Sequence, residues 1–128
     1  MIEVVAAIIY FEKKILCFQR GEGKYGYTSH KYEFPGGKIE PGEDRVQALK
    51  RELWEELEIQ VVIKEKVISV EHSYPDFDIL MHCYRCVTEE FHGCLKEHIN
   101  FKLLRPEDLQ SLEWMDADKP VVDLISAG

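Results

Sequence analysis

Three glutamates within five residues carry the clearest chemistry that this sequence offers. At 100° per residue, Glu55 projects about 60° to one side of Glu52 and Glu56 about 40° to the other, so all three share one helix face. Like charges at this spacing destabilise a helix by a few tenths of a kcal/mol per pair. The cluster therefore predicts a site for a hard cation such as magnesium. The alternative is a solvated face on which Arg51 pairs with Glu55.

The glycines that precede this cluster support the metal site. Backbone at Gly36 and Gly37 can approach a ligand closely and offer a carbonyl oxygen. A bound metal would neutralise the acids and carry a triphosphate. The formal net charge of −8 disfavours binding to DNA or RNA, so we expect neither a nucleic-acid polymer nor a membrane as partner. A small anionic substrate is compatible with this charge only if a metal bridges the two.

The elements that must position these residues can be read from the apolar pattern. Asp44 is expected to cap a helix over residues 44–57, with an apolar stripe at Val46, Leu49, Leu53 and Leu57. Pro35-Gly36-Gly37 predict a turn. Strands are expected near residues 2–11, 15–18, 61–71, 78–88 and 99–104, with a helical turn at 106–108 and a final helix from 116 to about 127. This order predicts an α/β domain over residues 1–128, with a mixed sheet covered on both faces.

The cysteines and the N-terminus indicate the cellular compartment of the protein. Four cysteines fit reduced thiols, and the odd spacing of Cys83 and Cys86 in a strand points them to opposite faces. The apolar N-terminus lacks the basic flank of a signal peptide, and no apolar run approaches the length of a membrane-spanning helix. We therefore expect a cytoplasmic protein.

The spacing of the acidic helix resembles the signature of the Nudix hydrolase family. Gly37, Glu43, Arg51-Glu52-Leu53, Glu55-Glu56 and Ile59 fall at its positions within segment 37–59. One position departs from it, because the signature expects glycine where this chain has Glu58. Glycine would end the helix in a left-handed conformation that costs other residues about 1–2 kcal/mol.

Residues 32–40 are similar to the MutT-like branch of that family, and the similarity implies a fold and a set of roles. The implied fold is an α/β/α sandwich with a central catalytic helix and a C-terminal helix. The implied cofactor is Mg²⁺, for which Mn²⁺ can substitute. By this resemblance, Arg51 holds the cluster and Glu43 pairs with it from the other end. The implied metal ligands are the Gly37 carbonyl, Glu52, Glu55, Glu56 and Glu97.

Two roles are left with alternatives. Glu97 sits where the branch carries a loop glutamate that binds metal or activates water, and Glu55 or Glu56 is the alternative base. Its neighbour His98 is expected to be a solvated loop residue. Phe34 either stacks on a nucleobase or belongs to the core.

The substrate is predicted from the same resemblance. Arg20 matches an arginine that contacts phosphate and base, and Asp118 matches the residue that reads the base edge, unless it caps the helix before Pro120. The implied activity is release of a nucleoside monophosphate and pyrophosphate from 8-oxo-dGTP or dGTP by a monomer or homodimer. Asp118 in place of Asn, and Phe77 in place of a basic residue, weaken this and favour CTP or dCTP as the alternative. ADP-ribose hydrolysis and a non-catalytic nucleotide sensor are further alternatives.

Overall fold

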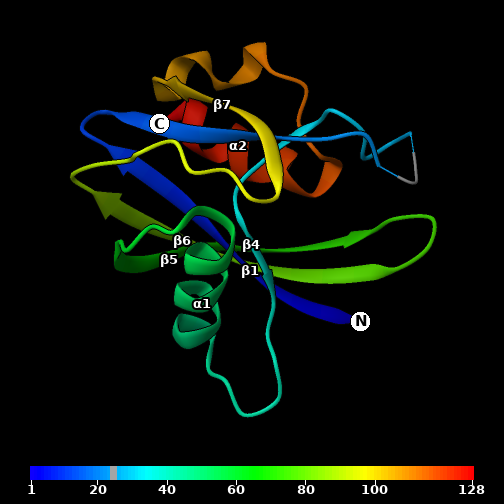
Figure 1. Cartoon of the computed structure of the whole chain (residues 1–128). Helices are drawn as coiled ribbons and strands as arrows, with labels where there is room; N and C mark the ends of the chain where they lie inside the picture. Colours follow the sequence, from blue (N-terminus) through cyan, green and yellow to red (C-terminus); the bar gives the residue numbers. More distant parts are fainter. Residues whose placement is uncertain (24–25) are drawn as a thin grey trace.

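The computed structural model describes residues 1–23 and 26–128 and contains one mixed sheet with helices on both sides (Figure 1). The strands run in the order β3-β2-β1-β6-β5, while β4 pairs with β1 and β7 pairs with β2. The elements are β1 (Ile2–Phe11), β2 (Lys14–Arg20), β3 (Tyr32–Glu33), β4 (Gly36–Lys38), α1 (Arg45–Leu57), β5 (Val62–Ser73), β6 (Asp78–Thr88), β7 (His98–Leu104), the 3₁₀ turns η1 (Pro106–Ser111) and η2 (Asp116–Asp118), and α2 (Lys119–Ala127).

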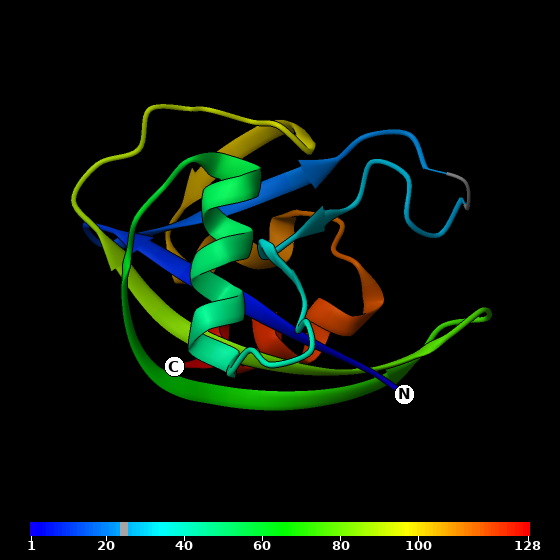
Figure 2. The same ribbon diagram turned by 60° about the horizontal axis from the view of Figure 1, so that its bottom comes forward.

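The centre of the sheet is the parallel pair β1–β6, which runs in continuous register from Ile2 opposite Ile79 to Phe11 opposite Thr88. β1 is apolar on both faces because both faces are covered. Its odd-numbered residues pack beneath α1 and its even-numbered residues pack with α2. In Figure 2, α1 crosses the face of the sheet nearest the viewer. The predicted α/β architecture with two covering helices is confirmed.

Helix α1 begins where the sequence predicts. Asp44 accepts a hydrogen bond from the Gln47 backbone N–H at 2.8 Å, and the Gln47 side chain accepts from the Asp44 N–H at 2.9 Å. The predicted stripe is correct for its three leucines but wrong for Val46, which is 37% exposed. Side chains tilt toward the N-terminus of their helix, so a first-turn residue extends beyond the packed face.

The predicted turn at Pro35-Gly36-Gly37 is instead a short strand, β4, that pairs with β1. A Cβ atom at Gly36 would lie 1.9 Å from the carbonyl oxygen of Val5, so only glycine fits this pairing. Cys83 and Cys86 lie on opposite faces of the sheet, as predicted. Within the described residues, no helix has the length and apolar character needed to span a membrane.

Candidate active site

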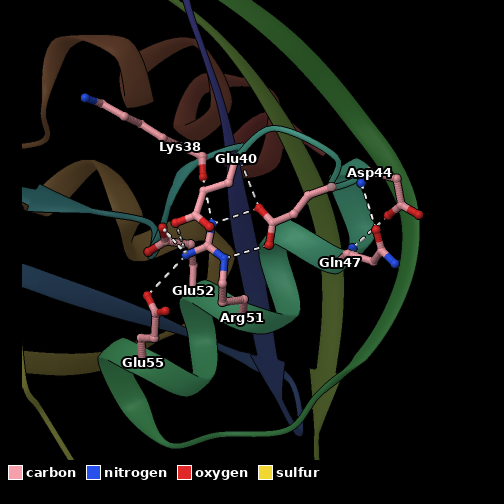
Figure 3. Close-up of polar contacts among 8 residues, drawn as sticks. Lys38, Glu40, Asp44, Gln47, Arg51, Glu52 and Glu55 are labelled. Carbon is pink, nitrogen blue, oxygen red and sulfur yellow. Dashed lines mark hydrogen bonds and ion pairs between the residues drawn. The ribbon is translucent and has the colours of Figure 1, made fainter.

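Arg51 lies at the centre of a polar cluster that joins α1 to the chain preceding it. Its guanidinium donates to both Glu43 oxygens, at 2.7 and 3.0 Å, and to the Lys38 carbonyl at 2.9 Å. It also donates to Glu52 at 3.0 Å and to Glu55 at 3.2 Å (Figure 3). These bonds raise the pKa of Arg51 and lower that of Glu43. The predicted pairing of Glu43 with the cluster is confirmed, and the fork fixes strand β4 against the helix.

Glu52 and Gly37 are in direct contact. A Cβ atom at residue 37 would lie 2.4 Å from the Glu52 carboxyl carbon, so glycine is required for the carboxylate to reach the backbone. The Glu52 side chain is only 15% exposed. Burial raises its pKa, although Arg51 opposes the shift. The structure thus places the Glu52 carboxylate against the backbone of β4, next to the Gly37 carbonyl that is predicted as a metal ligand.

Glu56 is the most strongly perturbed of the three helix acids. Burial, together with the charges of Glu33, Glu52 and Glu97, raises its pKa to about 9. One of its carboxylate oxygens is buried and finds no hydrogen-bond partner among the residues that the structure describes. A buried acid surrounded by other acids is electrostatically unfavourable unless a cation is present.

Glu55 is more exposed than the partly buried Glu52 and Glu56. Its side chain is 56% exposed and bonds to Arg51, as the solvated-face interpretation expected. Within the described part of the chain, no three His, Cys, Asp or Glu side chains are grouped closely enough to hold a metal ion. The acids that do converge are Glu52 and Glu56, together with Glu33 and Glu97, whose charges raise the pKa of Glu56.

A cavity of about 410 Å³ opens beside these acids. Gly37, Glu56 and Glu97 form the part of its lining that we call the acidic end, and Phe34 and Asp118 also line the cavity. Arg20 lines the cavity as well. The structure therefore brings most of the predicted site residues to one cavity. Four of them are not among its lining residues: Glu43, Arg51, Glu52 and Glu55.

Arg20 is held by a glutamate that sequence reasoning missed. Its guanidinium lies 3.2 Å from one oxygen of Glu33, whose other oxygen lies 2.9 Å from Nε2 of His98. The expectation that His98 is a solvated loop residue is wrong, because its ring is buried and packs on Phe18. No local sequence pattern marks Glu33 or His98. Their contact could not be predicted because 65 residues separate the two.

Asp118 does not cap α2. Asp118 directly precedes α2, and its own backbone dihedral angles are helical. Its side chain forms no capping hydrogen bond. The residue is 4% exposed, and its Oδ1 has no hydrogen-bond partner in the described structure. Burial, with the Glu33 charge, raises its pKa well above the usual value for aspartate. A buried carboxyl group with an unpartnered oxygen therefore lines the cavity.

Phe34 and Tyr74 shape the wall around Asp118. Phe34 is buried and packs against Trp114 at a ring distance of 4.8 Å, so it belongs to the core while it also lines the cavity. The Tyr74 hydroxyl accepts a hydrogen bond from the Ala117 N–H at 3.0 Å. This bond ties the β5–β6 hairpin to η2, and sequence reasoning missed it because its partners are 43 residues apart.

The chain between β6 and β7 brings Glu97 to the cavity. This loop passes the C-terminal end of α1 (Figure 2), where the Lys96 N–H donates to the Glu56 carbonyl at 3.0 Å. Glu97, the next residue, lines the acidic end of the cavity. At the same end of α1, Glu58 adopts the left-handed conformation, with φ 51° and ψ 39°, that the sequence led us to expect of a glycine.

Comparisons with known proteins agree with this arrangement. Residues 1–125 match the NUDIX domain family. The chain is 38% identical over 129 residues to the CTP pyrophosphohydrolase of Escherichia coli K12, covering 99% of this chain and 93% of that protein. An 8-oxo-dGTP diphosphatase of Haemophilus influenzae is 43% identical over 76 residues, which is 59% of this chain and 54% of the relative.

A solved structure extends the likeness to three dimensions. The solution structure of the E. coli ORF135 protein superposes with a TM-score of 0.81 at 37% identity, covering 99% of this chain and 89% of that one. Because the family match and the full-length relative each span almost the whole chain, the protein belongs to the Nudix hydrolase family.

Proposed function

We propose that the protein hydrolyses CTP or dCTP to the nucleoside monophosphate and pyrophosphate, with magnesium as cofactor. The relative that aligns along nearly the whole chain is a CTP pyrophosphohydrolase, whereas the Haemophilus 8-oxo-dGTP diphosphatase aligns over 59% of it. That alignment carries the choice of base, and the buried carboxyl group of Asp118 in the cavity is the group that we assign to contact the base.

The acidic end of the cavity fits a divalent cation. The unpartnered oxygen of Glu56, the raised pKa of that residue and the contact of Glu52 with Gly37 all describe a place where positive charge is needed. Magnesium needs only one or two carboxylates besides water and phosphate, so a group of three acids is not required. Glu56 and the Gly37 carbonyl would hold the ion with Glu52 or Glu97, and Glu55 would lie at its exposed side. When bound, magnesium offsets phosphate charge and lowers the pKa of water.

The reaction itself needs a proton acceptor and a phosphate anchor. Water adds to one phosphorus of the bridged α–β pair, the bond from that phosphorus to the bridging oxygen breaks, and the water proton passes to a carboxylate. We assign this proton to Glu97, which lines the cavity at the end of a loop. Arg20, oriented by Glu33, neutralises phosphate charge. Arg51 keeps Glu52 and β4 in place.

Asp118 selects the base through its protonation state. A neutral carboxylic acid donates through its hydroxyl and accepts through its carbonyl oxygen. Cytosine presents a donor at N4 beside an acceptor at N3, so the two groups are complementary. Uracil carries a donor at N3 and an acceptor at O4, with which a neutral carboxylic acid can also pair. The buried Asp118 is therefore compatible with cytosine, and the choice of cytosine over uracil rests on the relative that aligns along nearly the whole chain.

An 8-oxo-dGTP diphosphatase is the second candidate. It is supported by the partial alignment with enzymes of that name. In this case Asp118 would be ionised, because an ionised carboxylate accepts from both N1 and N2 of guanine. The raised pKa of Asp118 opposes that state.

A turnover screen separates the candidates. CTP, dCTP, UTP, dGTP, 8-oxo-dGTP and ADP-ribose are each incubated with the protein and magnesium, and products are separated by ion-exchange chromatography. We expect the highest kcat/KM for CTP or dCTP, with monophosphate and pyrophosphate as products. Water enriched in ¹⁸O then identifies the attacked phosphorus. A higher kcat/KM for 8-oxo-dGTP would support the second candidate, and release of a nucleoside diphosphate with orthophosphate would refute both.

A further inference from the structure

The one departure from the Nudix signature has a structural partner. Glu58 ends α1 in the left-handed conformation, with its backbone N–H bonded to the Trp54 carbonyl at 3.0 Å. Glycine suits this position because a Cβ atom crowds the neighbouring carbonyl. A glutamate here therefore carries a steric cost, which its side chain does nothing to reduce by itself.

The Glu58 carboxylate reaches the loop of residues 89–97. One oxygen lies 3.1 Å from Nζ of Lys96, and the other accepts a hydrogen bond from Sγ of Cys94 at 3.4 Å. Lys96 lowers the pKa of Glu58, while the same neighbourhood raises that of Cys94, which remains a thiol and a donor. Together with the bond from the Lys96 N–H to the Glu56 carbonyl, the last turn of α1 holds this loop at three points.

These contacts add polar links to a loop whose Phe91 and Leu95 pack against the core beneath α1. Its first half is anchored by Phe91, whose ring packs edge-on against Phe18 and Phe101 at 5.8 and 5.0 Å. Residues 89–97 form no helix or strand, and Gly93 introduces a positive φ of 74° between the anchored half and the second half. The second half ends at Glu97 in the acidic end of the cavity.

We propose that Glu58 is a positioning residue that holds residues 94–97 against the end of α1 and thereby keeps Glu97 at the reacting phosphate. The inference rests on the proposed function, which makes Glu97 the proton acceptor. It also explains why this chain retains glutamate at a position that favours glycine. The steric cost of Glu58 at the helix end is offset by the fixed position that it gives to Glu97, the proposed proton acceptor.

Replacing Glu58 with the glycine that the signature expects separates the effect of backbone strain from the effect of loop position. Glu58→Gly removes the left-handed strain together with the tether. We expect an equal or higher melting temperature, a kcat for CTP lower by about five- to tenfold, and little change in KM. Glu12→Gly is the matched control, since Glu12 is also a glutamate with positive φ (58°) but lies in the β1–β2 turn. It should raise the melting temperature similarly and leave kcat unchanged.

Two further variants connect the effect to the loop and to Glu97. Lys96→Met removes the ion pair without altering the helix end, so it should lower kcat comparably and add little to Glu58→Gly. In a Glu97→Gln background, Glu58→Gly should no longer change kcat. An equal loss of kcat in both backgrounds, or no loss in either, would overturn the positioning role.

Hydrogen exchange tests the tether without any turnover. Amides of residues 94–98 should exchange faster in Glu58→Gly than in the wild type or in Glu12→Gly. Unchanged exchange overturns the inference even if the enzyme is active. If the wild type releases no pyrophosphate from any nucleotide, the proposed function fails, and faster exchange in Glu58→Gly would show that the tether exists without its catalytic purpose.

Discussion

Two parts of the site hold carboxyl groups in different ways. At the acidic end, Glu56 is partly buried, and the charges of Glu33, Glu52 and Glu97 raise the electrostatic cost of ionising it. Asp118 is almost fully buried, and its burial contributes most to the rise in its pKa, with the Glu33 charge second. The first arrangement favours a bound cation, whereas the second favours a hydrogen-bonding carboxyl group. Substitutions at the acidic end should therefore act on rate, and those at Asp118 on the choice of base.

The largest effect is expected at Glu56. Glu56→Gln removes a proposed metal ligand, so kcat should fall by several orders of magnitude at saturating magnesium. Without metal, the same variant should melt several degrees higher than the wild type, because the buried acid no longer opposes folding. Stopped assays and thermal melts measure the two properties on one preparation. Wild-type turnover in this variant would remove Glu56 from the mechanism.

A smaller loss of rate is expected at Glu97, which the loop of residues 89–97 brings to the acidic end. Glu97→Gln should lower kcat by about a hundredfold with little change in KM, since a general base acts on the attacking water and not on substrate binding. Steady-state kinetics with CTP distinguish the roles. A raised KM with unchanged kcat would identify Glu97 as a substrate-binding residue. The proton acceptor would then be a carboxylate of α1.

Asp118 should affect discrimination more than rate. Asp118→Ala leaves hydrogen-bonding groups of the base unpaired, so kcat/KM for CTP relative to UTP should fall ten- to a hundredfold, for a cost of about 1–3 kcal/mol. Asp118→Asn keeps one donor and one acceptor, as a neutral acid does, and should preserve the preference for CTP. Loss of the preference in the asparagine variant would indicate that the group acts as a carboxylate.

The smallest expected effect is a pH dependence of stability. The pKa of Glu56 is raised to about 9 in the folded protein from an ordinary value of 4.5. Between these values the folded state holds a proton that the unfolded state has lost, so rising pH destabilises the fold. The metal-free melting temperature should therefore decline from pH 5 to pH 9. Glu56→Gln should flatten this decline, and magnesium should reduce it. Parallel curves for both proteins would assign the decline to other groups.

The sequence predicts best those parts of the molecule whose structure depends on residues close together in the chain. The start of α1 follows from Asp44 and Gln47, three residues apart, and the acidic face follows from helical periodicity. The apparent turn at Gly36 was misjudged because its partner, β1, lies thirty residues earlier in the chain, and pairing converts it to a strand. Val46 was misjudged because periodicity describes a helix face but not where the face ends.

The missed site residues depend on contacts between distant segments. His98 looked like a loop residue because its position after Leu95-Lys96-Glu97 has no local apolar pattern, yet β7 places its ring on Phe18. The hydrogen bond from Ala117 to Tyr74 likewise depends on the approach of η2 to the β5–β6 hairpin. Such contacts become visible only when the sheet order is known.

The parallel pairing of β1 with β6 also bears on how the chain is made. β1 leaves the ribosome first, but only Tyr10 and Phe11 pair with the next strand, whereas ten of its residues pair with β6. The apolar run from Val4 to Ile9 therefore remains without its main partner until the chain has been synthesised beyond Thr88. Pairings of such sequence separation form slowly, and unpaired apolar strands aggregate. The central strand of the sheet thus gains its main partner only late in synthesis, as β2 does with β7.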